Sequence, residues 1–149
     1  AKDIIAEQLS AQLPKNVVDN AKEMMDKITA GQKVDSVPPF LAALFRPSVQ
    51  PYLASWFKYT PADEIAKLTV PVLIVQGTTD IQTSAEDAKN LAAALPSARL
   101  DMIEGMNHIL KSAPSDRAAQ MPIYSDPTIP VVPKLLDDVA GFVKAVSKK

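Results

Sequence analysis

His108 is the one histidine of the 149-residue sequence, and it lies in the stretch IEGMNHIL, just after an apolar run. An imidazole titrates near neutral pH, so a histidine held in a loop can accept and return a proton. In a parallel sheet, catalytic groups gather in the loops that follow the strands. We therefore treat His108 as a candidate catalytic base. A loop histidine satisfied by backbone groups is the structural alternative.

Asp80 is the carboxylate best placed to work with His108, because it ends the loop GTTD after another apolar run, PVLIVQG. The separation of 28 residues (108 minus 80) accommodates a helical crossover and a second strand. Neighbouring strands lie about 4.8 Å apart, so Asp80 can reach the imidazole Nδ1, fix its tautomer and stabilise the imidazolium. A turn residue bonded to loop backbone is the alternative for Asp80. Asp87, which suits a helix N-terminus, and Glu104 are weaker candidates for the acid.

Three elements predicted from residue 70 onward bring these two loops together. PVLIVQG is typical of a buried strand, SAEDAKNLAAAL of a helix with Ser84 at its N-cap, and ARLDMIE of a second strand. Such a unit gives neighbouring parallel strands joined by a right-handed crossover. Residues 111–133 are rich in proline and are predicted to be irregular.

A final helix is predicted from its apolar stripe, which should lie against a face of the sheet. The stripe consists of Val132, Leu135, Leu136, Val139, Phe142, Val143 and Val146. Two parallel strands leave unpaired edges and an uncovered sheet face. We expect the missing strands to come from residues before Ala1, from another chain, or from self-association through the sheet edge.

Residues 1–69 show only helical periodicity and turn signals. An apolar repeat predicts a helix between Pro14 and Gly31, and further prolines divide the next stretch into short helical pieces. Six of the eight aromatic residues fall in this stretch: Phe40, Phe45, Tyr52, Trp56, Phe57 and Tyr59. They form either a wall over a substrate pocket or the core of a small helical unit. Trp56 and Phe57 are the candidate substrate contacts, with Met106 beside the histidine.

Composition excludes several classes of function. A net charge of −1, with 16 basic and 17 acidic residues well mixed, argues against a nucleic-acid partner. No apolar run approaches the roughly 18–20 residues that a membrane span needs, and the composition is typical of a soluble globular protein. One histidine without cysteine does not provide a zinc ligand set, so we predict neither metal nor cofactor. The absence of cysteine leaves the cellular compartment undetermined.

The segment PVLIVQGTTD…AEDAKNLAAALPSARLDMIEGMNHIL resembles the C-terminal half of the α/β-hydrolase fold, closest to bacterial serine esterases and serine-aminopeptidase-like hydrolases. In that family a G-x-x-D loop after the penultimate strand provides the acid of the triad, here Asp80. A G-x-N-H or G-x-x-H loop after the last strand provides the histidine, here His108. The resemblance implies an α/β fold in which residues 1–69 form a helical cap. Residues 70–149 are then the last strand–helix–strand–helix of the parallel sheet.

The chain departs from this family in lacking the nucleophile elbow G-x-S-x-G, since none of its four glycines flanks a serine at that spacing. The sequence also opens without Met, on an amphipathic helical pattern, so we expect it to be the C-terminal portion of a longer serine hydrolase of ester or amide substrates. Without the serine no acyl-enzyme can form, and the isolated chain is predicted to be inactive. An inert, self-associating chain or a non-enzymatic binding module derived from this fold is the alternative. A receiver-like α/β domain is disfavoured by the lack of an acidic cluster after the first strand.

Overall fold

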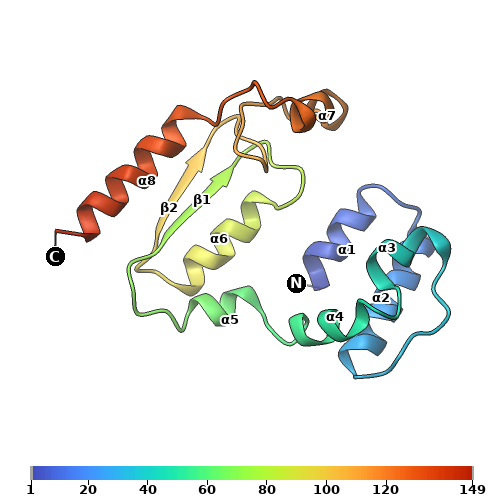
Figure 1. Ribbon diagram of the computed structural model, residues 1–149. Helices are drawn as coiled ribbons and strands as arrows, with labels where there is room; N and C mark the ends of the chain where they lie inside the picture. Colours follow the sequence, from blue (N-terminus) through green and yellow to red (C-terminus); the bar gives the residue numbers. More distant parts are fainter. Residues whose placement is uncertain (1, 149) are drawn as a thin grey trace. The chain divides into compact units, whose positions relative to one another are not determined.

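The structure, a computed structural model, describes residues 2–148 and contains two compact units (Figure 1). The first unit ends at Pro61 and the second begins at Ala62, whereas the sequence suggests a boundary after residue 69. Within residues 2–148, no helix is both long and apolar enough to cross a membrane.

The first unit is helical. Its elements are α1 (Lys2–Ser10), α2 (Lys15–Thr29), the 3₁₀ turn η1 (Pro39–Leu41), α3 (Ala42–Phe45) and α4 (Gln50–Trp56). Helix α2 begins directly after Pro14 and ends before Gly31, as the sequence predicts. Its apolar face packs into a core made of Ala21, Met25, Ile28, Leu41, Phe45, Leu53 and Phe57. The aromatic residues therefore divide into two groups, because Phe45 and Phe57 are buried while Trp56 is partly exposed.

The second unit contains the sheet. Its elements are α5 (Pro61–Ile65) at the boundary, β1 (Leu73–Gly77), α6 (Ala85–Ala94), β2 (Arg99–Ile103), α7 (Arg117–Ser125) and α8 (Pro133–Val146). The strands pair in parallel, with Leu73 opposite Arg99 and Gly77 opposite Ile103. Helix α6 starts at a capping box formed by Ser84 and Asp87. The predicted strand–helix–strand unit is thus confirmed, with α6 and α8 on opposite sides of the strands in Figure 1.

Helix α7 lies within residues 111–133, where the prediction of irregular structure is wrong. The carboxylate of Asp116 accepts a hydrogen bond from the backbone N–H of Ala119 at 2.8 Å and caps the helix. The residues that follow the cap are mostly good helix formers, and Pro122 removes only one intrahelical hydrogen bond before the helix ends at Ser125. A good N-cap followed by helix-forming residues therefore outweighs one internal proline.

Helix α8 contacts both strands, but only part of its apolar stripe is covered. Leu135 is buried, whereas Leu136, Val139 and Val143 are 58%, 41% and 51% exposed. The prediction that the stripe lies against the sheet holds for Leu135 and fails for these three. Two strands are about 4.8 Å apart, whereas a helix with its side chains is about 10 Å across, so this sheet is too narrow to cover the stripe.

Candidate functional site

Gly77, at the end of β1, allows the loops after the two strands to approach each other closely. A Cβ at this position would lie 1.9 Å from the backbone oxygen of Met106, where no side chain can fit. Beyond it, the backbone N–H of Thr78 donates to Ile103, and that of Thr79 donates to Met106. The loop 78–83, which we call the acid loop, is thereby joined to the loop 104–111, which we call the histidine loop.

The predicted hydrogen bond between Asp80 and His108 is present, with Nδ1 and Oδ2 2.9 Å apart. A carboxylate can only accept, so Nδ1 carries the hydrogen and Nε2 is the ring nitrogen that can take up a proton. The Asp80 side chain is 7% exposed, whereas the His108 side chain is 40% exposed. A buried anion thus orients an imidazole that remains open to solvent.

Asp80 is held as a carboxylate by donors on both of its oxygens. Oδ1 accepts from the backbone N–H of Gln82 at 2.7 Å and of Thr83 at 3.0 Å. Oδ2 accepts from the Thr83 hydroxyl at 2.8 Å and from Gln76 Nε2 at 3.2 Å, in addition to His108. Burial raises the pKa of Asp80, but the hydrogen bonds from Thr83, Gln82 and His108 outweigh it and leave the pKa below its ordinary value.

The two weaker candidates for the acid lie in other surroundings. Asp87 Oδ2 accepts from the backbone N–H and the hydroxyl of Ser84, so its carboxylate belongs to the capping box of α6. Glu104 is exposed just after the end of β2. The geometry therefore favours Asp80 as the partner of His108.

His108 stands in a tight turn that Asn107 organises. The backbone N–H of Leu110 donates to the Asn107 carbonyl at 2.9 Å, and the backbone N–H of Lys111 donates to Asn107 Oδ1 at 3.0 Å. Asn107 is 1% exposed. Leu110 has a φ of +66°, in the left-handed region that glycine adopts far more readily than leucine. The turn that presents His108 therefore contains a strained backbone position next to two hydrogen bonds to Asn107.

Sequence reasoning missed several residues that support the acid loop. Gln76 donates to Asp80, and the signal that could have found it is a polar side chain inside an otherwise apolar strand. Gln120 on α7 is fully buried and donates to the Thr79 carbonyl at 2.7 Å. Tyr124 accepts from Gln82 at 3.2 Å. The two α7 residues gave no local signal, because the segment itself was predicted to be irregular.

The three candidate substrate contacts are placed differently from one another. Trp56 is 43% exposed and stacks with Tyr52 and Phe57 in the first unit. Phe57 is buried in the core of that unit, and Met106 is 1% exposed in the core of the second. The packing of Phe57 and Met106 favours the structural alternative for both, and Trp56 keeps an open surface.

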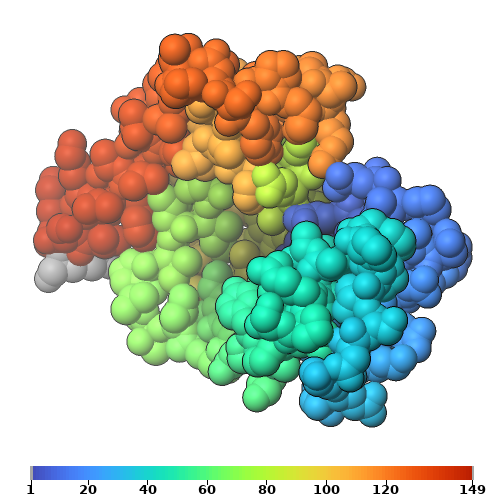
Figure 2. All heavy atoms as spheres, turned by 45° about the vertical axis from the view of Figure 1, so that its right-hand side comes forward, coloured from blue at the N-terminus to red at the C-terminus, as the bar shows by residue number. Residues whose placement is uncertain are grey.

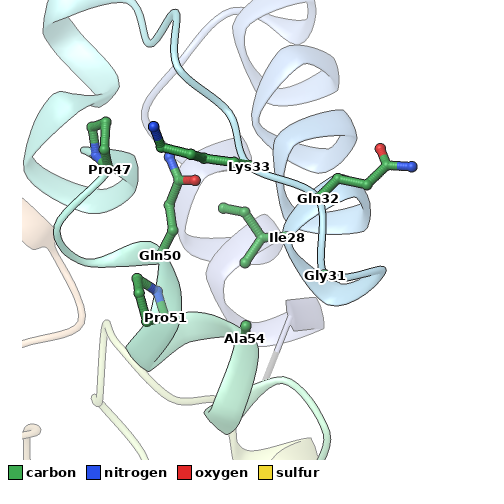
Figure 3. Close-up of a pocket in the computed structure, with 8 residues that line it drawn as sticks. All are labelled: Ile28, Gly31, Gln32, Lys33, Pro47, Gln50, Pro51 and Ala54. Carbon is green, nitrogen blue, oxygen red and sulfur yellow. The ribbon is translucent and has the colours of Figure 1, made fainter.

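A separate cavity of about 280 Å³ lies in the first unit, lined by Ile28, Gly31, Gln32, Lys33, Pro47, Gln50, Pro51 and Ala54 (Figure 3). Its buried polar side chain is Gln50, whose Nε2 donates to the Val34 and Phe45 carbonyls and whose Oε1 accepts from Val34 N–H. The Gln32 side chain points away from it in Figure 3. The cavity is thus lined mainly by apolar surface and brings together no pair of groups that could transfer a proton.

Among residues 2–148, no cluster of three or more histidine, cysteine or acidic side chains could hold a metal ion. The arrangement of Asp80 and His108 allows a proton to be transferred at His108 Nε2.

Comparison with known families gives a match to part of the chain. Residues 54–125, just under half of the chain, match the family model described as TAP-like protein, an α/β-hydrolase family. The matched region contains Asp80, His108 and the whole of α7. No solved structure matches the chain. The chain thus carries part of an α/β-hydrolase fold, with mixed helices and a small parallel sheet.

Proposed function

We propose, from the match of residues 54–125 to an α/β-hydrolase family model, that this chain supplies the acid and the base of a serine hydrolase. The reaction is hydrolysis of an ester, or an amide, of a small acyl or aryl substrate. The observation that carries the proposal is the 2.9 Å contact between His108 Nδ1 and Asp80 Oδ2 at the carboxyl edge of the sheet. That pairing leaves Nε2 of a solvent-exposed imidazole free to accept and return a proton.

In the proposed reaction, a serine hydroxyl attacks the substrate carbonyl while His108 Nε2 takes its proton. The imidazolium then returns this proton to the leaving alcohol or amine, and an acyl-enzyme remains. His108 next accepts a proton from water as the water attacks the acyl-enzyme, and then gives that proton back to the serine. Asp80 stays ionised throughout, holds Nδ1–H and stabilises the positive ring.

The serine of this reaction is proposed to lie outside this chain, because the sequence contains no G-x-S-x-G elbow. Trp56, whose ring is partly exposed, is the proposed contact for the acyl or aryl group. Phe57 and Met106 are buried, so their proposed contribution is to support the surfaces around them.

The direct test is a chimera in which this chain replaces the corresponding segment of an active TAP-like hydrolase, assayed with p-nitrophenyl butyrate. We expect turnover, and we expect His108→Ala and Asp80→Asn to reduce it by about 10²–10⁴-fold, the usual contribution of general base catalysis. Asp87→Asn is the matched control, because it removes a carboxylate committed to the α6 cap. A folded chimera without turnover, or one indifferent to His108→Ala, would contradict the proposal. Turnover by the isolated chain that depends on His108 would refute an external serine.

A second candidate function is self-association without catalysis. The observation that favours it is the uncovered part of α8, where Leu136, Val139 and Val143 are exposed together. It predicts a dimer or larger species in size-exclusion chromatography with light scattering, and a monomer after Val139→Glu. A wild-type chain that is monomeric at high micromolar concentration would exclude it.

A further inference from the structure

The segment between the histidine loop and α8, residues 112–132, forms a long loop whose two ends lie together. Lys111 and Val131 form an antiparallel bridge at the base of this loop, and the Val132 N–H donates to the Leu110 carbonyl at 2.9 Å. The Ala113 N–H donates to Gly105 at 2.8 Å. The segment that contains α7 is therefore anchored on both sides of the helix to the loop that carries His108.

One face of α7 reaches the acid loop on both sides of Asp80. Gln120 and Tyr124 are four residues apart and so lie on the same face of the helix. Gln120 contacts Thr79, the residue before Asp80, and Tyr124 contacts Gln82, two residues after it. Figure 2 shows the orange segment around α7 beside the yellow-green acid loop.

Gln120 itself connects the acid loop to the chain that leaves the histidine loop, through one side-chain amide. Nε2 donates to the Thr79 carbonyl at 2.7 Å and to the Pro114 carbonyl at 2.6 Å, which uses both of its hydrogens. Pro114 belongs to the chain leaving the histidine loop. The side chain is 0% exposed, so water does not compete for these bonds. A displacement of Gln120 would therefore move Thr79, the residue before Asp80, relative to the chain that leaves the histidine loop.

We propose that Gln120 is a positioning residue for the acid–base pair, which holds Thr79 so that the Asp80 carboxylate meets His108 Nδ1. The inference rests on the proposed function and extends it to a residue that touches neither the pair nor a substrate. Alignment of this kind matters because a shift of about 1 Å in a reacting group can cost on the order of 10²-fold in rate.

The test uses the full 149-residue chain and needs no substrate, because His108 is its single histidine. Imidazole ¹⁵N NMR, recorded at alkaline pH so that the ring is neutral, reports which ring nitrogen carries the hydrogen. In the wild type we expect mainly the Nδ1–H tautomer, since Asp80 accepts from Nδ1. Asp80→Asn removes the carboxylate that accepts from Nδ1 and so serves as the reference in which the pairing is lost. We expect the tautomer ratio of this variant to shift toward Nε2–H. We expect Gln120→Met, which keeps the length but removes both donated bonds, to shift in the same direction.

Two controls separate positioning from general loss of stability. Leu135→Ala weakens the core of the same unit, and Met121→Ala changes the exposed neighbour of Gln120 on α7. Neither is expected to change the tautomer ratio under conditions where the chain is folded. Tyr124→Phe removes only the hydroxyl that accepts from Gln82, and it tests the same face of α7. This variant should shift the tautomer ratio less than Gln120→Met.

The outcomes distinguish this inference from the proposed function. If Asp80→Asn shifts the tautomer ratio and folded Gln120→Met does not, Gln120 is not a positioning residue and the pair stands. If Gln120→Met does not fold, an unchanged ratio in Tyr124→Phe overturns the role of this face of α7. If Asp80→Asn itself leaves the ratio unchanged, the Asp80–His108 pairing fails and the proposed function fails with it.

Discussion

The carboxyl edge of the sheet and helix α8 belong to the same unit but are held in opposite ways. At the edge, both oxygens of Asp80 accept hydrogen bonds, His108 Nδ1 donates to one of them, and Nε2 of Gln76 and of Gln120 donates to neighbouring groups. Helix α8 places Leu135 in the core and leaves much of its apolar stripe exposed. The edge is therefore fixed by several directional bonds, whereas α8 meets the sheet through a few apolar contacts and an ion pair between Arg99 and Asp138. A site that needs accurate geometry is built where the structure is most constrained.

The largest difference in stability between these two regions is expected when one glycine in each is replaced by alanine. In Gly77→Ala the new Cβ meets Met106 backbone at 1.9 Å, so the loops must move apart. We expect the free energy of unfolding to fall by about 3 kcal/mol or more. Urea denaturation followed by circular dichroism measures the change.

Gly141→Ala on α8 is the matched control, because no atom beyond the adjacent residues and backbone of its own helix lies within 4 Å of the added methyl group. Alanine favours a helix over glycine by about 0.5–1 kcal/mol, so this variant should gain stability. Equal effects of the two substitutions would show that the edge is no more constrained than the helix.

A smaller effect on the free energy of unfolding is expected from acidification, because it protonates the Asp80 carboxylate at the carboxyl edge of the sheet. The pKa of Asp80 is lower in the folded chain than its ordinary value of 3.8, so the folded state binds its proton less readily than the unfolded state. The stabilisation is therefore complete above the ordinary pKa, and it is lost as pH falls through the folded pKa.

Asp80→Asn isolates this contribution from that of the other acidic residues. The difference in unfolding free energy between the wild type and the variant should be largest near neutral pH and should shrink as the solution is acidified below pH 3.8. Asp138→Asn, at the ion pair with Lys134 on α8, is the comparison from the other region. A wild-type-to-Asp80→Asn difference that stays constant with pH would contradict the assignment of the lowered pKa.

The sequence predicts those features of the sheet edge and of helix α8 that depend on the local pattern of residues. A continuous apolar run rich in β-branched residues, PVLIVQG, locates the first strand, and the shorter pattern ARLDMIE locates the second. The loops after these strands locate Asp80 and His108 without any structural information. The role of Gln120 depends on contact with Thr79, 41 residues away, and on a helix that the prolines obscured. The close approach at Gly77 is equally non-local, because it depends on where the Met106 backbone lies. The sequence also shows the apolar stripe of α8, but the width of the sheet decides how much of it is covered.

The smallest effect is expected at Leu110, where the histidine turn contains a strained residue. Its φ of +66° costs a residue other than glycine about 1–2 kcal/mol, and glycine adopts it freely. Glycine also has more conformational freedom to lose on folding, which offsets part of the gain. Leu110→Gly should therefore raise the free energy of unfolding by less than about 1 kcal/mol, whereas Leu110→Ala keeps the strain and should not. If both variants lose stability equally, the leucine side chain contributes more than its backbone strain costs, and the turn is held by packing as well as by Asn107.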